Sequence, residues 1–234
     1  MVREEVLGSF RYRWTADCFP LGRDSLELGA FATVRPRWRI CDLGCGGGLL
    51  LLLLAARAEG LTLAGVEQSP SAAEAARANL RQNGLCGTVL TGNLREGALP
   101  AGSWDLAVSN PPYFAPHTGA VAEGARGDAR AELTATLEDI FAAAERMLQW
   151  GGRFCLVYRP ERLAALLTAA VTHGLEPKRL QMVQHTARSA PSLVLLECRR
   201  GGKPGLSVEP PLLLRLEDGG ESHDVRRAYF RDKE

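Results

Sequence analysis

The sequence predicts an α/β fold, a mostly parallel sheet with helices on both faces. Apolar runs of strand length alternate with helical runs along the 234 residues, which is typical of right-handed βαβ crossovers. One strand leads into a glycine-rich loop and a helix, so a ligand can approach the backbone closely there. Polar residues end four successive strands, and they should meet at the carboxyl-terminal edge of the sheet, where α/β proteins bind ligands. These residues are Asp42 with Gly44, Glu67, Asn93 and Asn110.

Composition indicates a single globular domain, with 46% hydrophobic and 24% charged residues and a formal net charge of +1. The amino-terminal residues lack the apolar run of a signal peptide, and the longest apolar stretch, 49–56, is too short to span a bilayer. We therefore expect a cytoplasmic protein. The six cysteines are scattered, without a CxxC or Cys/His cluster, so no metal site and no disulfide framework are predicted.

Positive charge is concentrated in one segment. Residues 151–203 carry nine Lys or Arg and three carboxylates, whereas residues 41–150 carry seven basic and twelve acidic side chains. The basic segment is interpreted either as a face for a polyanion or as an ordinary solvated surface in an arginine-rich protein.

Before the first strand of the sheet, residues 11–14 interleave arginines with Tyr12 and Trp14, a pattern that can stack on bases. A turn-rich stretch follows. Asp24 or Ser25 then caps a short predicted helix that ends near Phe31.

The glycine loop follows a predicted strand at 38–43 and precedes a helix at 49–58. The dinucleotide fingerprint GxGxxG fails, because its third glycine would fall on Leu49. What fits is an acidic residue followed by alternating glycines: Asp42, Gly44, Gly46 and Gly48. This spacing resembles the first motif of class I S-adenosylmethionine-dependent methyltransferases.

The next two strands, 61–66 and 89–91, end in candidate cofactor contacts. Glu67 stands where an acidic residue can accept both hydrogen bonds of a ribose diol, although it can also be a solvated strand-end charge. Between the strands, Ser69 and Pro70 start a helix at 71–83. In related methyltransferases an Asp after the third strand reads the adenine amino group of the cofactor. Here the residue is Asn93, whose amide carbonyl can accept the same hydrogen bond.

The fourth strand, 104–109, ends in Asn110, Pro111, Pro112 and Tyr113. Two prolines make a rigid turn. The Asn110 carbonyl, the Pro111 carbonyl and an aromatic ring together suit a planar group that carries an amino group. The alternative is an ordinary strand-end turn.

The remaining chain is predicted as a lid or disordered loop at 114–132, then a helix at 133–150, a strand at 154–158, a helix at 160–170, and strands at 180–186 and 192–199. The tail, 201–234, is predicted to be irregular.

With these motifs the chain resembles class I methyltransferases that act on planar nitrogen, whose signature is Asn/Asp-Pro-Pro-Tyr/Phe. Within that group it is similar to the bacterial tRNA(Val) adenine-N6 methyltransferases, from about residue 19 to residue 214. The similarity includes residues 22–26, 110–113, 126–132 and 159–163. The chain departs from the family pattern in two places. Asn93 stands where the family usually has Asp, and the segment ahead of Asp24 lacks the family's commoner Gly-Tyr-Arg-Phe pattern.

The resemblance implies a Rossmann-like, seven-stranded sheet with an antiparallel carboxyl-terminal strand. It implies a cofactor-covering helix within 1–37, a catalytic core at 38–200 and S-adenosylmethionine as cofactor. RNA, most simply tRNA, is the implied partner of a monomer or homodimer. The implied site residues are for catalysis Asn110, Pro111, Pro112 and Tyr113; for the cofactor Asp24, Ser25, Asp42, Gly44, Cys45, Gly46, Gly48, Glu67, Gln68, Asn93, Leu94 and Asn110; and for the substrate Tyr113, Phe114, Arg126 and Arg130.

In the implied mechanism, Asn110 and Pro111 accept the two hydrogens of the target amino group, and Tyr113 stacks on the flipped base. Three alternatives stay open: N5 of a protein glutamine, another base in rRNA or DNA, and a non-catalytic RNA-binding relative.

Overall fold

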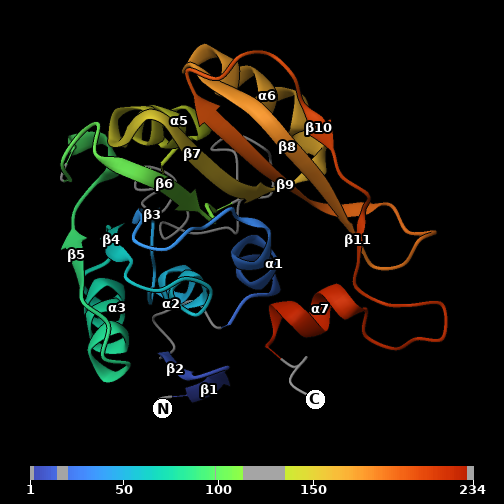
Figure 1. Cartoon of the computed structure of the whole chain (residues 1–234), viewed down its shortest axis with the longest axis horizontal. Helices are drawn as coiled ribbons and strands as arrows, with labels where there is room; N and C mark the ends of the chain where they lie inside the picture. Colours follow the sequence, from blue (N-terminus) through green and yellow to red (C-terminus); the bar gives the residue numbers. More distant parts are fainter. Residues whose placement is uncertain (1–2, 15–20, 98, 113–134, 231–234) are drawn as a thin grey trace, which may run out of the picture.

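A central sheet organises the protein in the computed structural model, which describes residues 3–14, 21–97, 99–112 and 135–230 (Figure 1). The strand order is β10-β8-β9-β7-β6-β3-β4-β5, and β11 also pairs with β8. Within this sheet β9 is the strand that runs antiparallel to its neighbours β7 and β8. The strands of the sheet are β3 (Arg39–Leu43), β4 (Thr62–Glu67), β5 (Gly87–Thr91), β6 (Trp104–Ser109), β7 (Leu148–Tyr158), β8 (Leu175–Gln184), β9 (Pro191–Arg200), β10 (Ser207–Val208) and β11 (Leu212–Leu213).

The predicted fold is confirmed. Seven strands form a mostly parallel sheet with one antiparallel member near the carboxyl terminus, and two-residue strands β10 and β11 extend it beside β8. The tail was expected to be irregular, and this is wrong for the described residues, because it contains these two strands and helix α7 (His223–Ala228). Leu212, Leu214 and Val225 anchor it in the core.

Helices cover both faces of the sheet and divide the core into two clusters (Figure 1). One cluster lies under α1, α2, α3 and α7, and the other lies under α5 and α6. The bounds are α1 (Arg23–Phe31), α2 (Leu49–Ala55), α3 (Pro70–Gln82), α5 (Leu137–Met147) and α6 (Leu163–Thr172), with single 3₁₀ turns at η1 (Leu94–Glu96) and η2 (Pro160–Arg162).

Helix caps and strand pairing set the boundaries. Ser69 caps α3 by accepting from the Ala72 N–H at 3.4 Å, and Thr136 and Asp139 form a capping box at the start of α5. The helix expected to run to residue 150 ends at Met147 instead, because Leu148 pairs with Trp104 and begins β7.

The first residues form a hairpin that the sequence analysis did not predict, β1 (Arg3–Leu7) and β2 (Phe10–Trp14). Tyr12 is buried and stacks on Trp14 with ring centroids 5.5 Å apart. The expectation that this segment can stack on bases is therefore wrong for Tyr12, whose ring belongs to the core.

Part of the basic segment is structural. Glu197 is buried, forms ion pairs with Arg153 and Arg179, and accepts a hydrogen bond from the Thr33 N–H at 3.1 Å. Burial acts to raise the pKa of Glu197, but the Thr33 N–H and the two guanidinium groups outweigh it and lower that pKa. Two of the nine cations thus serve the sheet rather than a polyanion.

Glu27 makes the stability of the fold depend on pH. It is fully buried on α1, and neither of its carboxyl oxygens has a hydrogen-bond partner in the part of the chain that the structure describes. Burial raises its pKa from the usual 4.5 to about 7, assisted by Asp224 and Asp24 and opposed by Arg23. Because the folded-state pKa is the higher one, stability is full below the unfolded pKa and falls as pH rises through about 7.

We expect Glu27→Leu to stabilise the protein by about 3 kcal/mol more at pH 8 than at pH 4.5, because folding raises the pKa of Glu27 from 4.5 to about 7. Urea unfolding at both pH values measures the difference. Glu59→Leu, at an exposed position, is the control. An equal effect of Glu27→Leu at both pH values would contradict a buried carboxyl that titrates on folding.

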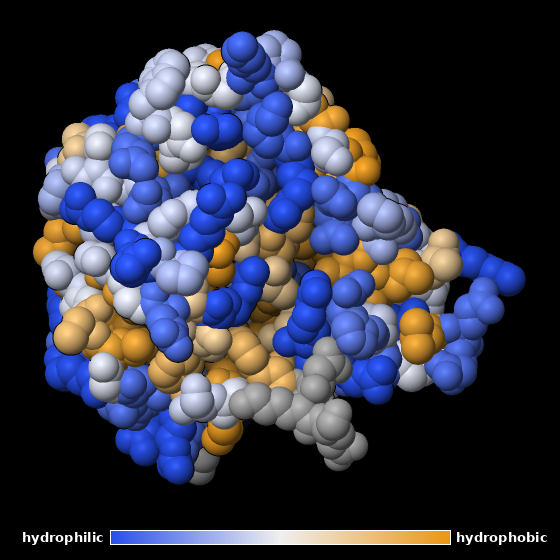
Figure 2. All heavy atoms as spheres, in the orientation of Figure 1, coloured by the Kyte–Doolittle hydropathy of each residue, from blue (hydrophilic) through white to orange (hydrophobic). Residues whose placement is uncertain are grey.

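None of the described helices is long and apolar enough to cross a membrane. In the orientation of Figure 1, hydrophilic residues cover most of the visible face, and hydrophobic residues show in a hollow near its centre (Figure 2).

Candidate active site at the carboxyl-terminal edge of the sheet

The ends of β3, β4, β5 and β6 lie side by side at one edge of the sheet. Parallel pairing sets Asp42 opposite both Gly65 and Val108, and sets Glu67 opposite Thr91. The residues that follow these strands, including Gly44, Asn93 and Asn110, therefore share this edge.

The glycine loop has a backbone that requires glycine. Gly44, Gly46 and Gly48 have φ values of 81°, 50° and 81°, in the left-handed region that L side chains rarely adopt. The N–H groups of Gly44 and Cys45 donate to the Val66 carbonyl at 2.9 and 3.1 Å. A Cβ at Gly44 or Gly46 would meet no atom within 4 Å. The loop thus borders open space into which a ligand can come close to the backbone.

Glu67 ties the loop to the second strand. Its Oε2 accepts from the Gly46 N–H at 2.8 Å, and its Oε1 accepts from the Ser69 N–H at 2.8 Å. Each carboxylate oxygen has further acceptor capacity, so Glu67 can hold the loop and still accept from a diol. The neighbouring Gln68 is exposed.

Asp42 is a buried residue with one carboxyl oxygen, Oδ1, that has no hydrogen-bond partner among the described residues. Burial, and next the charge of Glu67, raise its pKa well above the usual range. A cationic or N–H-bearing ligand would satisfy both features. The unpaired oxygen of Asp42, the glycine loop and the carboxylate of Glu67 together fit the ribose and amino acid parts of S-adenosylmethionine.

Asn93 lies beyond β5 and caps the short turn η1. Its Oδ1 accepts from the Arg95 N–H at 3.0 Å, and Leu94 is half-buried as the first residue of that turn. The second lone pair of Oδ1 leaves the expected contact to an amino group chemically feasible.

Asn110 is oriented by α1. Its Nδ2 donates to Ser25 Oγ at 2.9 Å, and the preceding Ser109 Oγ donates to the Leu43 carbonyl at 2.7 Å. Pro111 is buried and Pro112 is exposed. With the amide nitrogen held by Ser25, the carbonyl oxygen is the end of this side chain that can serve as an acceptor for a ligand.

Four predicted substrate residues lie outside the described residues, as does the expected lid at 114–132: Tyr113, Phe114, Arg126 and Arg130. Among the residues that are described, no group of three His, Cys, Asp or Glu side chains is placed to hold a metal ion.

Two supports of the glycine loop were missed by the sequence analysis. The buried Asn79 of α3 donates to the carbonyls of Gly47 and Arg13, each at 2.8 Å. Tyr12 lies over Gly47, where a Cβ would come within 2.6 Å of its hydroxyl. Neither residue carries a local sequence signal, because its partner is distant in the chain.

A cleft of about 440 Å³ opens beside Asp24, the residue before Ser25 on α1. Its charged residues besides Asp24 are Arg23 and Arg159, and Tyr229 supplies an aromatic ring. This cleft can receive an anionic, planar group.

Comparison with known proteins gives consistent matches. Residues 28–173 match the family model "Methyltransferase small domain". A tRNA1(Val) (adenine(37)-N6)-methyltransferase from Serratia proteamaculans is 34% identical over 88% of this chain and 80% of its own length. One from Porphyromonas gingivalis is 33% identical over 76% of this chain and 74% of its own.

Among solved structures, a protein described as a predicted O-methyltransferase from Agrobacterium tumefaciens matches with a TM-score of 0.72. It is 21% identical and covers 89% of this chain and 96% of its own. At that identity the match supports the fold alone.

Proposed function

Because the chain belongs to the methyltransferase small domain family, we propose that it transfers a methyl group from S-adenosylmethionine to N6 of an adenine in tRNA. The relatives named as tRNA1(Val) adenine-N6 methyltransferases match most of the chain. The single observation that carries the proposal is Asn110 at the end of β6, held by Ser25 beside the glycine loop. An amide acceptor next to a cofactor cradle suits transfer to an exocyclic amine.

When bound, S-adenosylmethionine supplies a methyl group activated by a positive sulfonium. Glu67, which fixes the glycine loop through Gly46, would accept from the ribose hydroxyls. Asp42, whose Oδ1 has no hydrogen-bond partner among the described residues, would offer the cofactor a further acceptor. Asn93 and Leu94, which follow β5, would hold the adenine. These residues bind and orient the donor.

Asn110 and Pro111 act on the acceptor. An adenine N6 lone pair is delocalised into the ring, so the nitrogen is a poor nucleophile. Two hydrogen bonds, to Asn110 Oδ1 and to the Pro111 carbonyl, favour a pyramidal nitrogen whose lone pair points at the methyl group. The transfer needs no general base before methylation, because the cationic product nitrogen releases its proton readily. Positioning then supplies most of the rate enhancement.

Recognition of the base requires flipping it from its stack. Tyr113 is proposed to stack on it, with Phe114, Arg126 and Arg130 nearby in the chain. The cleft with Arg23 and Arg159 is suited to a flanking phosphate, since guanidinium groups bind phosphate oxygens well.

Ser25 is a positioning residue in this mechanism. We expect Ser25→Ala to lower kcat by about tenfold, because one hydrogen bond of about 1–1.5 kcal/mol no longer fixes the Asn110 amide. Steady-state kinetics should show an unchanged KM for S-adenosylmethionine, and Ser25→Thr should restore part of the rate. A raised cofactor KM with an unchanged kcat would instead assign Ser25 to cofactor binding.

A tritium-methyl transfer assay against total tRNA, rRNA and protein tests the substrate class. Label is expected in tRNA. Label in protein, as glutamine N5 methylation requires, or in rRNA would replace the proposed substrate. No transfer to any of them would favour a non-catalytic relative.

A further inference from the structure

Trp150 projects from the sheet at the edge opposite Asn110. Trp104 pairs with Leu148 and Leu106 pairs with Arg153, so four residues of β7 bulge out opposite Asp105. The bulge is fastened by Gln149, whose Nε2 donates to Asp105 Oδ1 at 2.7 Å. Trp150 is 79% exposed, more than any other large hydrophobic side chain in the described part of the chain.

The Trp150 ring packs against the backbone of Gly201. A Cβ added to Gly201 would overlap the ring atoms. Gly201 has a φ of 63°, so this close approach depends on a glycine in the turn after β9. One side of the ring is therefore covered by backbone and the rest faces solvent.

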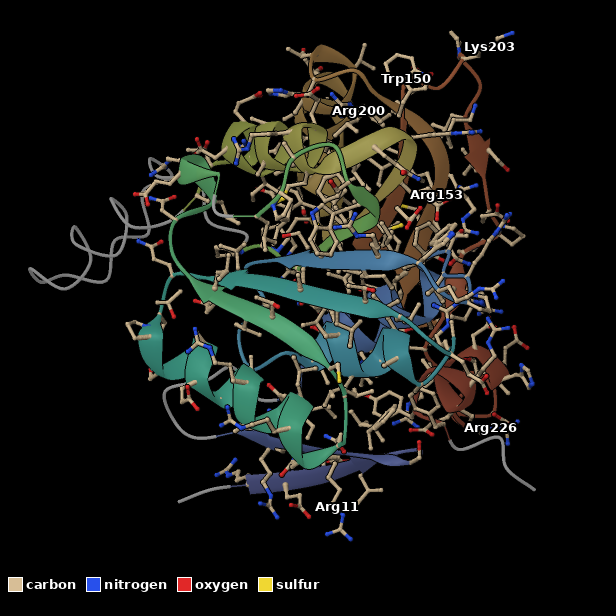
Figure 3. All side chains as sticks on the ribbon, turned by 60° about the vertical axis from the view of Figure 1, so that its left-hand side comes forward. Arg11, Trp150, Arg153, Arg200, Lys203 and Arg226 are labelled. Carbon is tan, nitrogen blue, oxygen red and sulfur yellow. The ribbon has the colours of Figure 1, made fainter. Side chains whose placement is uncertain are left out.

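Several cations lie at the same end of the molecule as this ring, and Figure 3 labels Arg200 and Lys203 there. Arg199 donates from Nε to the Gly151 carbonyl at 3.2 Å, and Lys178 donates from Nζ to the Lys203 carbonyl at 3.0 Å. Arg200 pairs with Glu145 at 2.5 Å. Lys178, Arg199 and Lys203 form no ion pair with any described carboxylate, although Glu176 lies opposite Arg199 in the strand register. We call Trp150, Lys178, Arg199, Arg200 and Lys203 the Trp150 patch.

We propose that the Trp150 patch is a second RNA contact, in which the indole stacks on an unpaired base and the flanking cations bind its phosphates. An aromatic face within a positive surface is the combination that binds single-stranded nucleic acid. A second copy of the chain is disfavoured as the occupant, because two positive patches repel one another. The inference rests on the proposed function, since it assumes an RNA substrate.

The position of the patch selects folded RNA. Asp105 lies near the start of β6 and Asn110 directly follows its end. The five residue steps from one to the other span about 17 Å at roughly 3.3 Å per residue. The patch and Asn110 lie at opposite edges, so one nucleotide cannot touch both. A folded tRNA can place its target adenine at Asn110 and another unpaired base at Trp150.

The test compares a full-length tRNA(Val) transcript with its isolated anticodon stem-loop. Trp150→Ala is expected to raise KM for the full-length transcript by roughly 5- to 150-fold, from about 1–3 kcal/mol per stacked base. The kcat value, and the kinetics on the stem-loop, should not change. Trp150→Phe should keep most of the affinity. Val6→Ala is the control, at a position 63% exposed on β1.

Salt dependence separates stacking from charge. Arg199→Gln should reduce the slope of log Kd against log salt by roughly 0.7–0.9, because one phosphate contact is lost. Trp150→Ala should leave that slope unchanged.

The proposal is overturned by an unchanged KM in Trp150→Ala, or by equal losses on both RNAs. A dimer in sedimentation experiments that Trp150→Ala dissociates would overturn it in favour of a second copy of the chain. If the wild-type protein methylates neither RNA, the proposed function fails instead, and that result is distinct.

Discussion

Asn110→Ala is expected to lower kcat by about 10²–10³-fold while S-adenosylmethionine binding survives. The loss has the size seen when one positioned hydrogen-bonding group is removed from a transition state. In the proposed mechanism Asn110, which Ser25 holds, orients the acceptor amine, whereas the glycine loop and Glu67, which are joined through Gly46, would make most of the cofactor contacts. Single-turnover kinetics measures the first effect, and calorimetry with S-adenosylmethionine measures the second.

Asn110→Asp is the matched variant. It keeps a carboxyl oxygen as acceptor for the target amine but removes the N–H that donates to Ser25. It should therefore retain more activity than Asn110→Ala. Calorimetry that shows lost cofactor binding in Asn110→Ala would contradict this division of roles.

Glu67→Ala is expected to have the second largest effect, on the cofactor side. A hydrogen bond to a charged acceptor is worth about 1.5–3 kcal/mol, so the loss of even one of the two diol bonds should raise Kd for S-adenosylmethionine at least roughly 10- to 150-fold. The same change frees the Gly46 N–H and the Ser69 N–H, which loosens the glycine loop. Calorimetry measures Kd, and kcat at saturating cofactor should change little.

Glu74→Ala is the control for this variant. Glu74 lies on α3 and forms surface ion pairs with Arg77 and Arg81, so its loss should leave Kd unchanged. If Glu67→Ala bound S-adenosylmethionine as tightly as the wild type, Glu67 would only stabilise the glycine loop, and another residue would have to accept hydrogen bonds from the ribose diol.

The central fold could be predicted because its signals are local. Strands β3, β4 and β6 are short apolar runs that each have a polar residue at or next to their end. The start of α3 is marked in the sequence by its N-cap Ser69 followed by Pro70. The hairpin has a local signal too, the two-residue turn Gly8-Ser9 between Leu7 and Phe10, which the sequence analysis overlooked. The tail could not be predicted in the same way, because β10 and β11 are two-residue strands that form only against β8.

The site was predicted as positions along the chain, not as contacts. Strand-end residues identify the edge, because parallel strands bring them together. The Ser25–Asn110 hydrogen bond joins residues 85 apart, and the Asn79–Gly47 bond joins residues 32 apart. Such pairs depend on how α1 and α3 pack on the sheet, so no sequence spacing reveals them. The helix at 133–150 was drawn too long for a related reason, since strand pairing overrode helical periodicity at Leu148.

The proposed mechanism is tested most directly by mass spectrometry of nucleosides from tRNA after reaction with S-adenosylmethionine. We expect N6-methyladenosine, formed by the wild-type protein and reduced by about 10²–10³-fold with Asn110→Ala. A methyl group on a ring nitrogen or on ribose would contradict it, as would N6-methyladenosine formed equally well by the Asn110→Ala variant.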